Sequence, residues 1–211
     1  MNYKKIYFSV FILFFSAACF SQQKNPAKAG NPVMPIIKDG VYFTFEDIKK
    51  NQPNLVLENL YKSMYDSTFT LWQWAHTANL YYIDKSGTRK ALNRDSIWGF
   101  SEDGTPYICL NQFFHKINTV GSISLFIEFY PLIRDPLSLV LTDSKGNSEE
   151  RILDFENGNT GSYELTYFNS ILVRDSALYN QFNAIKKERT KRKKMYVFLE
   201  KYNEIHPMFK N

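Results

Sequence analysis

Residues 96–110 read SIWGFSEDGTPYICL, and this stretch decides the fold class. The pair Asp103-Gly104 separates two apolar runs at 96–101 and 107–110. An Asp-Gly pair between two such runs is typical of a tight β-hairpin, because both central positions of the turn need a positive φ. The stretch therefore predicts two antiparallel strands joined by a short turn.

Similar patterns recur on both sides of this hairpin. Strand pairs are expected at 79–92 around a turn at 84–87, at 113–129 around Val120-Gly121, and at 137–155 around a turn at 143–147. Residues 69–76 also alternate, and we interpret them as a strand with Trp72, Trp74 and His76 on one face. Short strands at this spacing indicate an antiparallel sheet, either open or closed into a partly open barrel.

A short helix is expected before these strands. Val41-Tyr42-Phe43 is a short apolar strand, and Thr44 follows it with Asp47 three residues later. This spacing is typical of a capping box, and the helix that it starts must end before Pro53. The predicted class is therefore α+β: mainly antiparallel sheet or partly open barrel, a short N-terminal helix and a long basic C-terminal helix.

The pattern changes to helical near the C-terminus. A short helix is expected at 167–173, and Asp175 is a suitable N-cap for a long one that ends before Pro207. The long helix, 175–206, is apolar on one stripe at both ends and basic through its centre, so it is amphipathic. Residues 36–174 form the predicted β-rich globular domain that it packs against.

The N-terminal residues have the pattern of a secretory signal peptide. Two lysines precede an uncharged apolar run at 6–18, shorter than the roughly 20 residues of a membrane span. Cleavage after residue 21 fits the small-residue rule, so 1–21 is the expected signal peptide and 22–35 a flexible linker. The alternative is lipidation of Cys19, since residues 16–19 resemble a lipobox. We expect a periplasmic or secreted protein, with an outer-membrane lipoprotein as the alternative and no membrane span in the mature chain.

Most of the positive charge lies in one short segment. Residues 186–194 contain seven basic residues and one acidic residue, a net charge of +6, which is more than the net charge of +5 of the whole chain. These are the candidate residues for an anionic partner: Lys186, Lys187, Arg189, Lys191, Arg192, Lys193 and Lys194. The partner would be an anionic envelope component or an acidic protein. Nucleic acid is not expected, because no aromatic residue interrupts the segment to stack on bases. The alternative is a solvated helix face that leans on the acidic remainder of the same chain.

Trp72, Trp74 and His76 are the second candidate site. If their shared face is exposed, two tryptophans two residues apart form a flat platform on which a sugar can stack. If it is buried, they belong to an ordinary aromatic core.

No catalytic or metal motif stands out in the chain. Of the three histidines, His115 and His206 have no acidic, cysteine or histidine neighbour at ligand spacing, and no nucleophile or phosphate-binding motif is present. We therefore expect no cofactor, no metal and no catalytic residue that the sequence alone can identify. Cys109 lies in an apolar run and is expected to be a buried, unreactive thiol. A hydrolase that assembles two carboxylates from distant strands stays open.

Four stretches resemble a family of uncharacterised exported proteins of Bacteroidota, with a domain of unknown function. They are DGVYFTFED at 39–47, DSIWGF at 95–100 continuing to Tyr107-Ile108, Asp175-x-x-Leu178-Tyr179-x-x-Phe182, and Lys201-Tyr202-Asn203-x-x-His206-Pro207. The resemblance spans most of the chain after the signal peptide. It implies an exported location and an architecture, but no mechanism.

The favoured hypothesis is a non-enzymatic envelope or secreted interaction protein that uses its basic helix against an anionic partner or surface. A carbohydrate-binding module built on Trp72 and Trp74 is the first alternative. An unrecognised periplasmic hydrolase is the second. The oligomeric state and the identity of any partner are not readable from the sequence.

Overall fold

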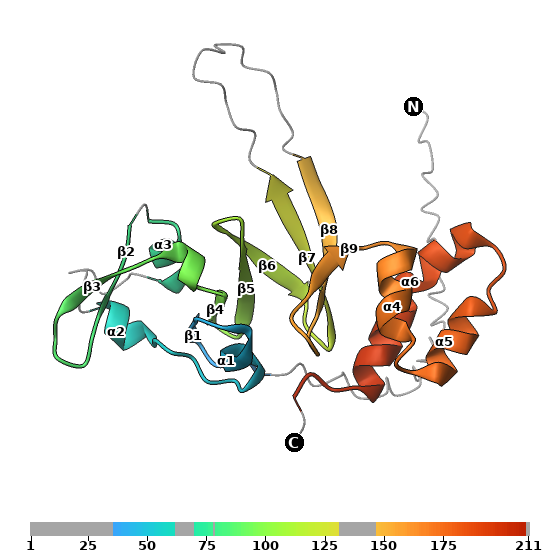
Figure 1. The fold of residues 1–211 in the computed structure, drawn as a ribbon, viewed down its shortest axis with the longest axis horizontal. Helices are drawn as coiled ribbons and strands as arrows, with labels where there is room; N and C mark the ends of the chain where they lie inside the picture. The colour runs from blue at the N-terminus through green and yellow to red at the C-terminus, as the bar shows by residue number, and fades with distance from the viewer. Residues whose placement is uncertain (1–35, 62–69, 78, 131–146, 210–211) are drawn as a thin grey trace, which may run out of the picture. The chain divides into compact units, whose positions relative to one another are not determined.

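A seven-stranded antiparallel sheet forms the centre of the fold (Figure 1). The computed structural model describes residues 36–61, 70–77, 79–130 and 147–209. The strand order is β1-β4-β5-β6-β7-β8-β9, and every neighbouring pair is antiparallel. The strands are β1 (Gly40–Tyr42), β4 (Gly99–Glu102), β5 (Thr105–Leu110), β6 (Phe113–Thr119), β7 (Ile123–Tyr130), β8 (Asn147–Asp154) and β9 (Thr160–Ser162). Within the described residues β1 and β9 are the two edges, so the sheet is open. The α+β prediction with a mainly antiparallel sheet is confirmed, and the strands of the described residues do not close into the partly open barrel that was its alternative.

The turn that decided the fold class has the expected geometry. Asp103 and Gly104 have φ values of 51° and 69°, and they connect β4 to β5 in register from Gly99↔Ile108 to Glu102↔Thr105. The 79–92 hairpin is also present as β2 (Leu80–Ile83) and β3 (Arg89–Leu92), which form a separate two-stranded sheet. Local turn chemistry thus fixed both pairings.

The N-terminal helix begins as predicted. In α1 (Phe45–Lys49), the Thr44 hydroxyl accepts from the backbone N–H of Asp47, and the Asp47 carboxylate accepts from the backbone N–H of Thr44. A second short helix, α2 (Leu57–Tyr61), follows. A short 3₁₀ helix, η1 (Arg94–Ser96), precedes β4.

The expected strand at 69–76 is wrong: Leu71–Ala75 form the helix α3. Thr70 and Gln73 form a capping box, in which the Thr70 side chain accepts from the Gln73 N–H and the Gln73 side chain accepts from the Thr70 N–H. The buried residues Leu71, Trp74 and Ala75 follow helical i, i+3, i+4 spacing rather than the alternation of a strand. The reciprocal cap and the buried stripe both favour a helix here.

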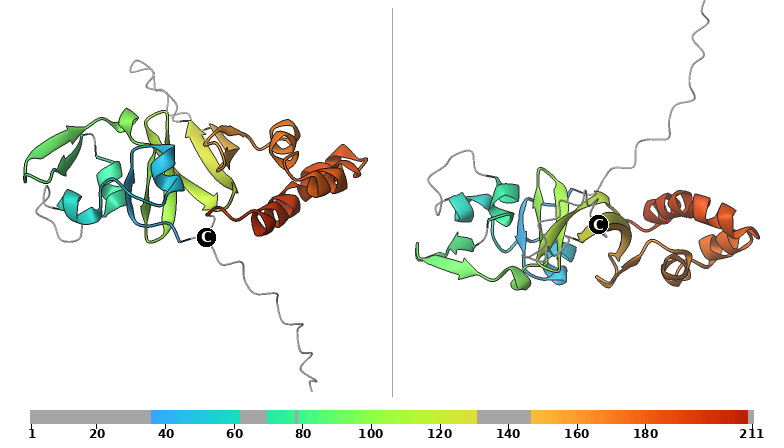
Figure 2. Two further views of the ribbon diagram at one scale, coloured as in Figure 1. Left: turned by 60° about the horizontal axis from the view of Figure 1, so that its bottom comes forward. Right: turned by 90° about the horizontal axis from the view of Figure 1, so that it is seen from above.

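Three helices follow strand β9 and lie beside the β7–β9 end of the sheet (Figures 1 and 2). They are α4 (Leu165–Leu172), α5 (Ser176–Asn183) and α6 (Glu188–Ile205). The short helix and the Asp175 cap are confirmed, because the Asp175 side chain accepts from the Leu178 N–H at 2.9 Å. The single helix at 175–206 is wrong, since the chain reverses between α5 and α6.

Core packing explains this reversal. The rings of Phe182 and Phe198 lie 5.0 Å apart and pack edge to face in one apolar cluster with strands β7 and β8. In a continuous helix their sixteen-residue separation would place them about 24 Å apart. The break between the helices therefore lets both apolar stripes bury against the same face of the sheet.

Several predictions fall outside the described residues. These are the signal peptide and linker at 1–35 with Cys19, and the strand at 137–142. None of the helices in the described ranges is both long and apolar enough to cross a membrane.

Candidate functional site

The basic residues 186–194 lie at the turn between α5 and α6. Lys186 and Lys187 are in the connection, and the other five belong to the first two turns of α6. Six of the seven side chains are exposed, and only Lys191 is half-buried. We call this group of seven the basic tip.

Two members of the basic tip are engaged within the fold. The Lys191 ammonium donates to the Asn183 side chain at 2.6 Å and lies 5.5 Å from the centre of the Phe182 ring. The Arg192 guanidinium pairs with Glu188 one turn earlier at 3.0 Å. The Lys191 contact joins the start of α6 to α5, and the Arg192 pair stabilises the first turns of α6 itself.

The other five cations have no ion pair with a described carboxylate. No described Asp or Glu lies within 4.0 Å of the charged groups of Lys186, Lys187, Arg189, Lys193 and Lys194. The reason is the pattern of burial, because the first buried residue of α6 is Met195. The first two turns therefore extend past the apolar core, and no ion pair in the described residues supports the alternative that they lean on an acidic body.

The opposite end of α6 is fixed to the sheet. The Asn203 side chain accepts from the Ile123 N–H at 2.7 Å and donates to its carbonyl at 2.9 Å. This pairing needs Gly121, because a Cβ there would lie 2.3 Å from the Asn203 amide nitrogen. The His206 ring lies 2.9 Å from the Asp175 carboxylate, which joins the end of α6 to the start of α5. The basic tip is thus presented by a helix whose other end is firmly held.

The platform of two tryptophans does not form. Trp74 is 1% exposed, and its indole N–H donates to the Tyr81 carbonyl at 2.9 Å. Trp72 is 46% exposed and stacks on His76, with ring centres 4.0 Å apart. The structure brings Trp72 and His76 together because they are four residues apart on a helical turn, and it sends Trp74 into the core for the same reason.

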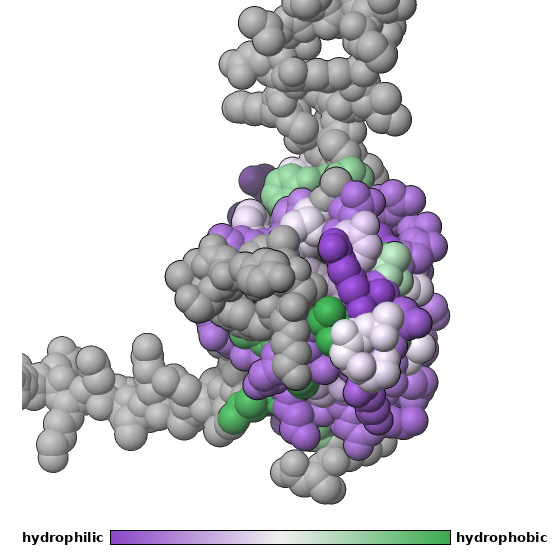
Figure 3. All heavy atoms as spheres, turned by 90° about the vertical axis from the view of Figure 1, so that its left-hand side faces the viewer, coloured by the Kyte–Doolittle hydropathy of each residue, from purple (hydrophilic) through white to green (hydrophobic). Residues whose placement is uncertain are grey.

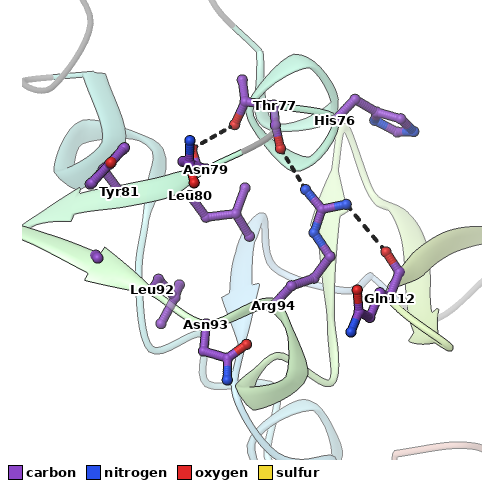
Figure 4. Close-up of a pocket in the computed structure, with 10 residues that line it drawn as sticks. His76, Thr77, Asn79, Leu80, Tyr81, Leu92, Asn93, Arg94 and Gln112 are labelled. Carbon is purple, nitrogen blue, oxygen red and sulfur yellow. Dashed lines mark hydrogen bonds between the residues drawn. The ribbon is translucent and has the colours of Figure 1, made fainter.

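His76 also lines a hollow beside the β2–β3 hairpin (Figure 4). The hollow has a volume of about 410 Å³. Arg94 crosses it, with its guanidinium donating to the carbonyls of Thr77 and Gln112. Sequence reasoning missed Arg94, because these three residues are far apart in the chain and no local pattern joins them.

A second group that the sequence did not reveal lies at one end of β7 and β8. Glu128 and Glu149 are directly opposite in the strand register, and Arg151 approaches their carboxylates at 3.6 and 3.4 Å. The Asn111 amide donates to Glu128 at 3.0 Å. The hydrolase alternative requires two neighbouring carboxylates. Here both carboxylates pair with Arg151, and we interpret the group as a contact that joins the two strands.

Cys109 and His115 are two further titratable side chains of the described residues. Burial raises the pKa of the Cys109 thiol to about 11, although the Arg94 charge opposes this, so the thiol is protonated at neutral pH. Burial also lowers the pKa of His115, which keeps its ring neutral. Within the described ranges, no three His, Cys, Asp or Glu side chains lie together as a metal ligand set.

Comparison of the chain with protein-family models, curated proteins and solved structures finds no match. The fold and the site therefore define only a class, an α+β protein with an open antiparallel sheet and a basic helical tip.

Proposed function

We propose that this protein is an exported, non-enzymatic interaction protein that binds an anionic envelope component or an acidic protein through its basic tip. Periplasmic or secreted location is part of the proposal, with attachment through a lipidated Cys19 as the alternative. The observation that carries it is the set of five exposed cations without a described carboxylate partner.

Electrostatics explains why such a cluster favours a ligand. Like charges on adjacent helical turns repel one another, so the isolated tip is less stable than a tip with mixed charges. An anionic surface removes this repulsion and gains about 1 kcal/mol for each basic residue brought close to it. Because the cations are exposed, the attraction is long-ranged at low ionic strength and is screened within about 10 Å at 0.1 M salt.

The shape of the tip favours a surface or an acidic patch over nucleic acid. Its cations occur on several sides of the first two turns of α6 and in the preceding connection, so they form a blunt charged end rather than a groove. No aromatic side chain lies between Lys186 and Lys194 to stack on bases. Tyr196 and Val197 are exposed on the next turn. They can contact an apolar part of the partner next to the anionic groups that the cations bind.

The test compares two variants of the purified protein with equal loss of charge. The tip variant replaces Lys186, Lys187, Lys193 and Lys194 by glutamine. The control variant replaces four exposed lysines outside α6 by glutamine, namely Lys38, Lys50, Lys85 and Lys116. Each is measured for sedimentation with vesicles that contain phosphatidylglycerol and for capture of partners from an envelope fraction, at low and at high salt.

We expect the tip variant to bind far more weakly than the control, by up to about a thousandfold if each lysine contributes about 1 kcal/mol. Binding of the wild type should also fall as salt rises. Equal binding by both variants, or binding by the wild type that salt leaves unchanged, contradicts the role of the basic tip. Retention on vesicles selects an anionic surface, whereas salt-sensitive capture of an acidic protein alone selects a protein partner.

A further inference from the structure

The hollow beside the β2–β3 hairpin is separate from the basic tip and is built from different elements. Its lining comes from the loop after α3, from the two strands of the hairpin, from the start of η1 and from the turn between β5 and β6. Exposed amide side chains of Asn79, Asn93 and Gln112 contribute to it, whereas no acidic residue does. Its volume of about 410 Å³ is within the range of small-molecule sites, roughly 300–1,000 Å³.

Among the residues that line the hollow, Arg94 is the only one with a permanent charge. Its two terminal nitrogens donate to the Thr77 carbonyl at 2.5 Å and the Gln112 carbonyl at 3.2 Å, so the guanidinium plane is held in place (Figure 4). No carboxylate of the described residues lies within ion-pair distance of it. A guanidinium has five N–H donors, and the two carbonyls use only two of them. Because carbonyls are neutral, the positive charge of Arg94 is not compensated, and the remaining donors can bind a carboxylate.

The turn that Arg94 holds is itself strained. Asn111 and Gln112 both have positive φ, at 51° and 67°, although glutamine has no special tolerance for this region. Such a conformation costs about 1–2 kcal/mol per residue. The hydrogen bond from Arg94 to the Gln112 carbonyl helps to keep it, and the lining amide of Gln112 is thereby held next to the guanidinium.

His76 contributes a ring to the lining of the hollow, and Trp72 stacks on that ring. The Nδ1 atom of His76 lies 2.7 Å from the Trp72 carbonyl, which only accepts, so Nδ1 carries the proton. In the neutral ring, Nε2 is then an acceptor for a hydroxyl group. Trp72 supports this ring by stacking and stays 46% exposed.

We propose that this hollow binds a carboxylate-bearing sugar of the uronic acid type. Arg94 receives the carboxylate, while His76 Nε2 and the lining amides bind the ring hydroxyls. The polar lining fits such a ligand, because it contains three amide side chains and a guanidinium. Figure 3 views the molecule from the side of the β2–β3 hairpin, and the described residues on this face are mainly hydrophilic. A purely apolar ligand would form no hydrogen bond with the remaining guanidinium donors or with the lining amides, whereas a ligand with a carboxylate and hydroxyl groups can.

The test is titration of the purified protein with glucuronic acid, glucose, acetate and glucose 6-phosphate. Binding is followed by tryptophan fluorescence and by NMR signals of the side-chain amides of Asn79, Asn93 and Gln112. The variants are Arg94→Gln, which removes the charge, and Arg94→Lys, which keeps the charge without the fork of donors. Lys85→Gln is the control for the loss of one positive charge, since Lys85 is exposed at the turn of the same hairpin and does not line the hollow.

We expect glucuronic acid to shift these amide signals and to bind at least tenfold more tightly than glucose. Arg94→Gln should remove that preference, because a neutral amide cannot form charge-assisted hydrogen bonds with the carboxylate. Arg94→Lys should weaken it and Lys85→Gln should leave it intact. The result for the wild type stands even if Arg94→Gln fails to fold.

Four results overturn the proposal. The first is no amide shift in the wild type with glucuronic acid, and the second is glucose binding of equal strength. Equal binding of acetate shows an anion site without sugar recognition. Tighter binding of glucose 6-phosphate shows a phosphate site. None of these results bears on the basic tip, because the tip variant keeps every residue of the hollow.

Discussion

Arg174 is expected to be one of the residues on which the attachment of the helices to the sheet depends most. It follows α4 and makes two hydrogen bonds to the Asp154 carboxylate on β8, at 2.8 and 2.6 Å. The Asp154 side chain is only 3% exposed, and its other acceptor contact is the Glu156 N–H at 3.2 Å. Arg174 also pairs with Glu156 at 2.9 Å, but that carboxylate is 66% exposed and contributes little.

The perturbation is Arg174→Met, which keeps most of the side-chain volume and removes the charge. Asp154 is then a buried carboxylate without a cation, and breaking such a pair costs about 3–5 kcal/mol. In a protein of this size each kcal/mol corresponds to about 2–4 °C, so the melting temperature should fall by about 6–20 °C. The free energy of unfolding from urea titration gives the same quantity independently.

Two further variants make this prediction strict. Asp154→Asn with Arg174→Met removes both charges, and it should recover at least half of the loss because no uncompensated charge stays buried. Arg189→Met removes an exposed arginine of α6 and should change stability by no more than about 0.5 kcal/mol. A loss below about 1 kcal/mol for Arg174→Met would refute the assigned role of the pair, and so would a double variant whose loss is additive.

Three other changes test local features. Tyr167→Phe should stabilise the protein by about 1 kcal/mol in thermal unfolding, because the Tyr167 hydroxyl is buried and has no hydrogen-bond partner among the described residues. A destabilised variant would contradict this, because it would show that the hydroxyl has a hydrogen-bond partner. Gly104→Ala should destabilise by about 1 kcal/mol in urea titration through its φ of 69°, since no atom lies within 4 Å of an added Cβ; an unchanged midpoint would contradict this. The Leu178 N–H and then His206 lower the pKa of Asp175, so its carboxylate stabilises the fold above its unfolded pKa of about 3.9 and loses this as pH falls further. Asp175→Asn keeps the helix cap, and its stability should therefore fall less steeply than that of the wild type below about pH 4, whereas parallel curves would exclude the effect.

The two proposed sites can be tested independently of each other. The basic tip acts through charge at the end of a helix, so its binding should depend strongly on salt. The hollow acts through a fixed guanidinium and neutral polar groups, so its selectivity between glucuronic acid and glucose should survive neutralisation of the tip. If both are right, the protein connects an anionic partner to an acidic sugar.

Sequence patterns were reliable at three places where short-range hydrogen bonds decide the structure. The Asp103-Gly104 turn, the Thr44–Asp47 capping box and the Asp175 cap all formed as predicted. The failure at 69–76 has a similarly local origin, because alternating tryptophans hid the Thr70–Gln73 capping box. Periodicity is ambiguous over so few residues, and helical burial of Leu71 and Trp74 settles it.

By itself, the sequence determined the antiparallel sheet, the helix starts and the concentration of charge at 186–194, because each depends on residues within a few positions of one another. Tertiary structure decided the rest. Burial of Phe182 and Phe198 in one core divided the C-terminal helix and turned its basic residues into an exposed tip. Folding also placed Arg94 between the carbonyls of Thr77 and Gln112. Contacts between residues this far apart in the chain arise only when the core closes, so no local pattern records them.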